Sequence, residues 1–279
     1  MNYPPPALNF LGTRGKLCVR LTQSSAEVAI AQRLRYKVFY EELNATPSPD
    51  ALKSQADADR FDDICDHLIV VDQAAIRRDD QFAVHDGVMV GTYRLLRQAV
   101  AEKNGGFYTQ SEFNIAPLLA AKPDLNFLEL GRSCVLREFR IKHVVELLWQ
   151  GIWNYVRHHG LDVMLGCASL EGVDVGQHAA TLDFLARNCA PPPEWTVRAL
   201  PERFVEMKSP AANSLDAKTA LKLLPPLIKG YLRLGCYIGD GAVIDHQFNT
   251  IDVLIILPVS SINPRYFTHF GKPEDTITG

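Results

Sequence analysis

The 279-residue sequence contains few cysteines, no long apolar run and no marked excess of charge of either sign. Its six cysteines are scattered and include no C-x-x-C pair, which argues against a zinc module or a disulfide framework, so we expect them to be reduced. The 29 basic residues nearly balance 32 acidic ones, and the overall charge therefore indicates no nucleic-acid partner. The longest apolar stretch, Val253 to Val259, is far too short to span a bilayer.

The N-terminal residues, Met1 to Pro6, have neither the basic region nor the apolar region of a signal peptide. We therefore expect a cytoplasmic protein whose membrane contact, if it has any, is peripheral at the inner face of the cell membrane. The chain is long enough for one large domain or two smaller ones. The simplest organisation is an N-terminal extension over 1–16 and one domain over 17–279, in which 200–279 form a C-terminal extension.

Strand and helix signals alternate without strict βαβ regularity, which predicts an α/β (α+β) fold with a mixed sheet covered by helices. Ser24 followed by Glu27 is a capping-box signature that opens a helix running to about Leu43. The proline-containing segment from Asn44 to Ala58 is expected to be a loop. The other predicted elements are strands at 17–21, 67–72, 88–96, 127–135, 163–168, near Thr196, 242–245 and 253–258, and helices at 115–120, 142–158, 175–189 and 216–234, the last interrupted at Pro225 and Pro226.

The most informative stretch runs from Phe127 to Val135, because it places an acid and a base inside an apparently buried strand. Burying a charge without a partner is costly, so Glu129 and Arg132 either pair with nearby charges or face a cleft. Cysteine and serine follow them directly, but no histidine or acid accompanies Cys134 in a triad motif, which argues against covalent catalysis.

Several ordered blocks of the sequence resemble a known family. Residues 34–39, 59–62, 91–96 and 129–135 resemble the acyl-carrier-protein-dependent branch of the GNAT N-acyltransferases, which includes the acyl-homoserine lactone synthases. Longer blocks are similar to the bacterial ornithine N-acyltransferases of lyso-ornithine lipid synthesis, and this similarity extends from about Leu17 to Gly271. These longer blocks are 107–113, 164–169 and 224–235.

The resemblance implies a GNAT-like fold with a mixed, mostly antiparallel central sheet flanked by helices. It further implies an N-acyltransferase that moves a (3-hydroxy)fatty acyl group from acyl carrier protein to the α-amine of L-ornithine, with no bound cofactor and no metal. Three alternatives stay open: an enzyme like the acyl-homoserine lactone synthases, an N-acyl amino acid synthase with another acceptor, and a lipid-binding module without catalytic activity.

One segment departs from the general GNAT pattern. The phosphate loop of that fold is usually rich in glycine, whereas residues 137–143 contain none, so the backbone can approach a pyrophosphate less closely. A phosphopantetheine arm carries one phosphate and makes a smaller demand. Since the position matches the cofactor phosphate site and acyl carrier proteins are acidic, we expect Arg137, Arg140, Lys142 and His143 to bind the phosphopantetheine phosphate and the carrier protein. A solvated helix start is the simpler alternative.

N-acylation requires a neutral amine and a stabilised oxyanion. Glu129 is the candidate base, directly or through water, because its apolar neighbours should raise its pKa and because the lactone synthases point to the same position. The alternative is a structural ion pair with Arg132 or Arg94.

The carboxylate of an amino acid substrate calls for a guanidinium, and the family match indicates Arg35, Arg94 and Arg132. Phe39 is a candidate wall of the pocket, although it could equally be core.

The second amine of ornithine stays cationic and calls for a carboxylate. Asp59 and Asp62 match the acidic pair of the family and are the first candidates, whereas Asp245 and Asp252 are weaker ones.

Overall fold

The structure, a computed structural model, describes residues 10–75, 80–209, 217–262 and 266. The chain divides into two compact units: unit 1 combines residues up to 105 with 130–160, and unit 2 combines 106–129 with 161–269. The expected extensions at 1–16 and 200–279 lie partly outside the described residues, and the single domain over 17–279 stays a prediction. In the described part of the chain, no helix is both long enough and apolar enough to cross a membrane.

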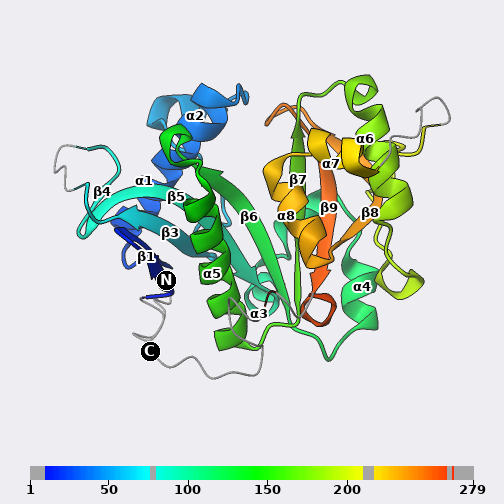
Figure 1. Cartoon of the computed structure of the whole chain (residues 1–279), viewed down its shortest axis with the longest axis horizontal. Coiled ribbons are helices and arrows are strands. Elements are labelled where there is room, and N and C mark those ends of the chain that lie inside the picture. Colours follow the sequence, from blue (N-terminus) through cyan, green and yellow to red (C-terminus); the bar gives the residue numbers. More distant parts are fainter. Residues whose placement is uncertain (1–9, 76–79, 210–216, 263–265, 267–279) are drawn as a thin grey trace. The chain divides into compact units, whose positions relative to one another are not determined.

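Unit 1 contains an antiparallel sheet in which β1 pairs with β2, β2 with β3, and β3 with β5, while the short β4 also pairs with β5 (Figure 1). Its strands are β1 (Gly12–Arg14), β2 (Leu17–Leu21), β3 (Asp66–Asp72), β4 (Ala83–Val84), β5 (Gly87–Arg97) and the second part of β6 (Phe127–Val135). Its helices are α1 (Ser25–Tyr36), α2 (Pro49–Ser54), α3 (Gln98–Ala101) and α5 (Lys142–His159), and a π-helix (Lys37–Glu42) continues α1.

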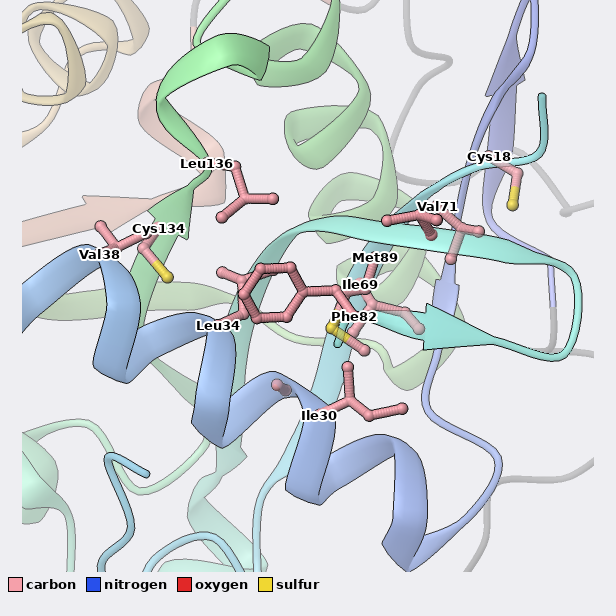
Figure 2. Packing of buried hydrophobic residues seen from close by; sticks show 12 residues of the cluster. Cys18, Ile30, Leu34, Val38, Ile69, Val71, Phe82, Met89, Cys134 and Leu136 are labelled. Carbon is pink, nitrogen blue, oxygen red and sulfur yellow. The ribbon is translucent and has the colours of Figure 1, made fainter. Parts of the chain in front are cut away.

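Helices α1 and α5 cover opposite faces of this sheet (Figure 1). Successive strand residues point to opposite sides, so neighbouring residues of one strand pack against different helices. Gly151 of α5 lies so close to the sheet that a Cβ there would be 2.7 Å from Cγ2 of Val19 and 3.1 Å from Cδ1 of Leu68. The neighbouring residues Cys18 and Ile69 instead join the core beneath α1. Figure 2 shows this hydrophobic cluster beneath α1, which also contains Ile30, Leu34, Val38, Val71, Phe82, Met89, Cys134 and Leu136.

Unit 2 contains the first part of β6, which pairs in parallel with β7, and an antiparallel series in which β7 pairs with β9 and β9 with β8. The further strands are β7 (Val163–Glu171), β8 (Tyr237–Asp245) and β9 (Thr250–Pro258). The helices are α4 (Ala116–Ala121), α6 (Val175–Asn188), α7 (Ala217–Leu223) and α8 (Pro226–Leu234), with 3-10 turns at Tyr108–Ser111, Pro193–Trp195 and Val259–Ser261. The predicted mixed, mostly antiparallel sheet with flanking helices is thus confirmed.

Two local predictions were wrong. The expected loop at 44–58 contains α2, because Ser48 caps the helix by accepting a hydrogen bond from the Ala51 amide and Pro49 occupies the first turn, where its missing N–H costs nothing. The strand expected near Thr196 is absent from the described residues of that stretch, where a 3-10 turn precedes single bridges at Arg198 and Ala199. The short elements β1, β4 and α3 were not predicted.

Candidate functional site

In unit 1, three arginines and three aspartates form one hydrogen-bonded network. They are Arg35, Arg94, Arg132, Asp57, Asp59 and Asp62. Five of these six residues were selected from the sequence. Asp57 was missed because it lies in the segment expected to be a loop, and the only signal for it was its position two residues before Asp59.

Arg35, in the last turn of α1, is the centre of the network and only 1% exposed. Its Nη1 and Nη2 donate to the two oxygens of Asp62, each at 2.8 Å, and its Nε donates to Oδ2 of Asp57 at 2.8 Å. Burial alone would lower the pKa of Arg35, but the negative charges of Asp57 and Asp62 outweigh it and raise that pKa. Arg35 is therefore a permanently charged, fully paired group.

The same balance fixes the charge of Asp62. Burial by itself would raise the pKa of its carboxyl group, but the hydrogen bonds and charge of Arg35, followed by the charge of Arg94, hold that pKa well below its ordinary value. The turn that carries the aspartates is itself ordered by them, since Asp59 N donates to Oδ2 of Asp62 at 3.0 Å and Phe61 N donates to Oδ1 of Asp59 at 2.8 Å. The network is thus built into the backbone.

Arg94 of β5 and Arg132 of β6 complete the network from the sheet. Nη1 of Arg94 donates to Oδ1 of Asp59 at 2.6 Å and to Oδ1 of Asp62 at 3.2 Å. Arg132 donates from Nε to Asp57 and from Nη2 to Asp59, both at 3.2 Å. Its side chain is 13% exposed, compared with 4% for Arg94, so Arg132 is the guanidinium of the network most accessible from solvent.

Arg132 also has an unusual backbone. Its φ angle of 51° lies in the left-handed region, which costs a residue with a Cβ about 1–2 kcal/mol. Such strain often marks positions where a side chain must be held in one direction. Here it accompanies the contacts of Arg132 with Asp57 and Asp59.

Glu129 belongs to unit 2, on the first part of β6, and is 6% exposed. Both of its oxygens accept backbone hydrogen bonds from the 3-10 turn at Tyr108–Ser111: Tyr108 N donates to Oε2 at 3.0 Å and Thr109 N to Oε1 at 2.7 Å. The geometry therefore orients the carboxylate firmly and leaves its proposed role as a base a prediction.

A second acidic group in unit 2 consists of Glu112, Asp245 and Asp252, all buried. One oxygen from each lies within 4.8 Å of the others, a spacing that could also hold a metal ion. The Cys167 thiol donates to Oε2 of Glu112 at 3.1 Å, and Nη1 of Arg203 lies 3.6 Å from Oε1. Burial, followed by the charge of Asp252, raises the pKa of Glu112 to about 7. Glu112 and Cys167 lie in the family-like blocks 107–113 and 164–169, but no pattern within those blocks singled them out.

The four residues predicted to bind phosphopantetheine and the carrier protein lie on the surface of unit 1, around the start of α5. Arg137, Lys142 and His143 have exposed side chains. Arg140 forms an ion pair with Glu42 and donates from Nε to the Val135 carbonyl at 3.0 Å. The positive charges are therefore arranged on one short segment.

Phe39 and Cys134, both considered at the sequence level, and the nearby His67 all have roles in the packing of unit 1. Phe39 packs, half-buried, against the hydrophobic cluster beneath α1. Burial raises the pKa of the Cys134 thiol, which keeps it protonated and poorly nucleophilic. Burial, followed by the charge of Arg35, lowers the pKa of His67 to about 4, so its ring is neutral near pH 7. All six cysteines are free, as predicted.

A further group that could hold a metal ion consists of Glu27, His85 and Asp86 in unit 1. Arg20 donates to both carboxylates, at 2.8 Å to each oxygen of Glu27 and at 2.7 Å to Oδ1 of Asp86. A guanidinium thus already supplies the positive charge between them. The absence of a metal in the function of this protein stays a prediction.

Comparison with known proteins identifies the family. Residues 34–150 match the acetyltransferase (GNAT) domain family. The chain is 48% identical over 268 residues to the L-ornithine N(alpha)-acyltransferase of Agrobacterium fabrum, which covers 96% of this chain and 89% of the relative. The chain belongs to the L-ornithine N(alpha)-acyltransferase family. A more distant member, from Rhodobacter capsulatus, is 35% identical over 249 residues, covering 89% of this chain and 92% of that protein.

Membership of the L-ornithine N(alpha)-acyltransferase family confirms the resemblance seen in the sequence, and the chain is accordingly an N-acyltransferase. Among solved structures, an N-acyl amino acid synthase from uncultured soil microbes is similar with a TM-score of 0.43 and 10% identity, covering 90% of this chain and 97% of that one. A CoA-dependent acyl-homoserine lactone synthase has a TM-score of 0.44 and 14% identity, covering 90% of this chain and 84% of the other.

Proposed function

We propose that this protein transfers a (3-hydroxy)fatty acyl group from acyl carrier protein to the α-amine of L-ornithine, giving lyso-ornithine lipid. The observation that carries the proposal is the near full-length similarity to relatives named L-ornithine N(alpha)-acyltransferase, at 48% identity for the Agrobacterium fabrum protein. The charged groups described above supply what this chemistry needs. They include guanidinium groups for a carboxylate, a fixed carboxylate for proton transfer and acidic groups for a second amine.

Arg132 is the proposed anchor for the ornithine carboxylate. Arg35 is 1% exposed and fully engaged with Asp57 and Asp62, so it cannot reach a substrate without breaking the centre of the network. Arg132 has longer contacts, at 3.2 Å, and the more accessible side chain. We assign Arg35 and Arg94 the role of positioning the aspartates that hold Arg132, which is a charge-assisted arrangement of the kind that orients a binding group.

Glu129 is the proposed proton acceptor. The neutral α-amine attacks the thioester carbonyl, the new C–N bond forms, and the carbonyl oxygen becomes an oxyanion. The nitrogen gives up a proton to Glu129, directly or through a water molecule. The oxyanion then re-forms the carbonyl as the C–S bond breaks, and the leaving phosphopantetheine sulfur takes that proton from Glu129 and departs as a thiol. A carboxylate whose two oxygens accept hydrogen bonds from Tyr108 and Thr109 is held in one orientation, which favours such a transfer.

The side-chain ammonium of ornithine needs a carboxylate partner, and two acidic groups offer one. Asp59 and Asp62 each contact two arginines already. By contrast, Glu112, Asp245 and Asp252 bring three carboxylates together in unit 2, where Arg203 is the cation paired with Glu112 among the described residues. The excess of acidic groups favours the second cluster, which includes the two residues that the sequence ranked lower.

The donor is proposed to be acyl carrier protein, bound through the exposed cations near the start of α5, with no bound cofactor and no metal. These cations suit a phosphopantetheine phosphate and an acidic carrier surface. Because the product is an amphiphile, we also propose a peripheral contact with the inner face of the cell membrane. A nucleic-acid partner is not part of the proposal.

The test is an acyl-transfer assay that offers ornithine, norvaline, lysine and S-adenosylmethionine with long-chain acyl carrier protein or acyl-CoA, with products identified by mass spectrometry. Norvaline has the carbon chain of ornithine without the second amine, so it isolates the contribution of that ammonium. Preference for ornithine with acyl carrier protein is expected. Equal use of norvaline and ornithine would show that the enzyme has no binding site for the second ammonium. Lactone formation from S-adenosylmethionine would favour a lactone synthase. Use of acetyl-CoA alone would overturn the proposal.

A further inference from the structure

We infer that the outer side of α7 and α8 binds the anionic surface of a phospholipid membrane. The inference specifies the peripheral contact named under the proposed function and rests on that part of it alone. We call this region, part of unit 2, the α7–α8 surface (Figure 1). Its members are Lys218, Leu221, Lys222, Leu223, Lys229 and Arg233.

The apolar part of the α7–α8 surface consists of two leucines. Leu221 is 39% exposed and Leu223 is 61% exposed, and they are the large apolar side chains that the described residues of unit 2 leave exposed. The helices are held from below by other residues, since Ala220, Ile228 and Tyr231 are buried. The exposed leucines are therefore not needed to fix α7 in place. Because they are two residues apart, the two leucines flank the exposed side of α7, with Lys218 and Lys222 between them. Exposed leucines on either side of a row of lysines can insert among lipid headgroups.

The charged part is of one sign. Residues 217–239 contain four lysines and arginines and no aspartate or glutamate. Among the described residues, none of these four cations takes part in an ion pair, whereas the cations near the start of α5 lie beside Glu42 and Glu146. Each basic side chain near an anionic membrane contributes about 1 kcal/mol to binding. The α7–α8 surface is thus complementary in charge to anionic lipid.

Contacts between the helices place these cations together. Nζ of Lys229 donates to the Lys222 carbonyl at 2.9 Å, which brings the start of α8 next to the end of α7. Arg233 lies one turn beyond Lys229 on the same side of α8. Lys218 lies one turn before Lys222 on α7 in the same way. The exposed side of α7 therefore carries Lys218 and Lys222 between the two leucines, and Lys229 and Arg233 lie on one side of α8.

The composition favours lipid over a protein partner. The centres of protein interfaces are enriched in aromatic residues and arginine and depleted in lysine, and leucine is rare among their energetic hot spots. A lysine-rich surface with exposed leucines is typical of helices that lie in the membrane interface. An acidic carrier protein is the other partner to consider, and the experiment separates the two.

The experiment measures co-sedimentation of the full-length protein with vesicles of phosphatidylcholine alone and of phosphatidylcholine mixed with phosphatidylglycerol. We expect binding to the anionic vesicles only. Replacing Lys218 and Lys222 by glutamine should weaken that binding about 30-fold, from about fivefold for each charge. Replacing Leu221 and Leu223 by serine should weaken it on the order of tenfold. The matched control is the pair Leu52→Ser and Lys53→Gln on α2, whose leucine is 57% exposed, and it should bind like the unchanged protein.

Circular dichroism spectra and thermal unfolding of each variant establish that it is folded. Equal binding to both kinds of vesicle, or binding unchanged in both α7–α8 variants, overturns the inference. Loss of affinity for acyl carrier protein in these variants, with vesicle binding intact, also overturns it and assigns the surface to the carrier protein. Acyl transfer to ornithine from soluble acyl carrier protein should be unchanged in the variants, so failure of the lipid inference is distinguishable from failure of the proposed reaction.

Discussion

Arg35 and Asp62 form a two-point contact in the interior of unit 1, in which Nη1 and Nη2 of the arginine each donate to a different oxygen of the aspartate at 2.8 Å. Both side chains are almost fully buried. Two parallel hydrogen bonds between oppositely charged groups fix direction as well as distance. The pair therefore connects α1 to the turn that carries Asp59, and through it to Arg132.

Replacing Asp62 by asparagine should lower the free energy of unfolding by about 3–5 kcal/mol, because it leaves the buried guanidinium of Arg35 without one of its two counter-charges. Urea denaturation followed by circular dichroism measures the change. The control is Glu41→Gln, which breaks the pair with Lys37, a surface contact of 3.8 Å. It should cost less than about 0.5 kcal/mol. Equal effects of the two variants would show that the Arg35–Asp62 pair is not a structural centre.

Arg132 permits a test that separates backbone strain from side-chain chemistry. Because its φ angle is 51°, Arg132→Gly should be more stable than Arg132→Ala by about 1 kcal/mol, although both lack the guanidinium. If the guanidinium anchors the substrate carboxylate, both variants should raise the KM for ornithine by about 10- to 100-fold, as expected for a lost charged hydrogen bond. An unchanged KM in both variants would remove Arg132 as the anchor.

If Glu129 is the general base, replacing it by glutamine should lower kcat about 100- to 10,000-fold. Affinity for acyl carrier protein should not change. The matched control is Gln110→Ala: Oε1 of Gln110 accepts the Phe107 amide at 2.7 Å and so orders the same 3-10 turn, but the variant leaves the Glu129 carboxylate in place. Full activity of Glu129→Gln excludes it as the base. If Gln110→Ala lost as much activity as Glu129→Gln, the carboxylate would act by ordering the turn instead.

Long secondary-structure elements were predicted from the sequence more reliably than short ones, because a short element contains too few residues to show a hydrophobic pattern. Strands β3 and β5 were predicted because each contains apolar runs, whereas β1 and β4 have two or three residues and show no periodicity. Helix α2 was missed because Pro47 and Pro49 are typical of a loop, although Pro49 is compatible with a first turn.

The candidate site shows a similar division. Charged residues inside apolar runs, such as Arg94, are conspicuous in a sequence. Asp57 and Glu112 are not, because acidic residues in polar segments are usually solvated, and only tertiary packing shows that these two are buried. The left-handed backbone of Arg132 also has no local signal, since such conformations usually occur at glycine.

Glu112 should make ornithine binding depend on pH near neutrality. Its pKa in the folded protein is raised to about 7, first by burial and then by Asp252, so the folded state retains a proton that the unfolded state has already lost. Stability therefore decreases as pH rises from the ordinary glutamate pKa of about 4.3 to about 7, and then levels off. Glu112→Gln should abolish this decrease. If Glu112 holds the ornithine ammonium, the KM for ornithine should fall as pH rises through 7 in the unchanged protein but not in the variant.

Norvaline is the matched substrate for this measurement, because it lacks the second amine. Its KM should not follow the titration of Glu112. A parallel pH dependence for ornithine and norvaline would show that the titration acts on the α-amine or on folding, and would leave Asp59 and Asp62 as the candidates for the ammonium.

The cations near the start of α5 should determine affinity for the carrier protein. Arg137 and Lys142 are suitable for substitution because their side chains are 73% and 83% exposed, so alanine at both positions should leave folding intact. Arg140 is less suitable, since its contacts with Glu42 and the Val135 carbonyl also hold unit 1 together.

Because exposed charges act mainly on the rate of association, we expect the variant with alanine at both Arg137 and Lys142 to raise the KM for acyl carrier protein about 10-fold at low salt, with kcat unchanged. The difference should shrink at high salt, where exposed charges are screened. Lys103→Ala, on another exposed segment of unit 1, should have no effect. A short acyl-pantetheine donor without phosphate or protein should be used equally by the double variant and the unchanged protein, and a loss with that donor would place the two cations in the acyl-transfer site instead of at the docking surface.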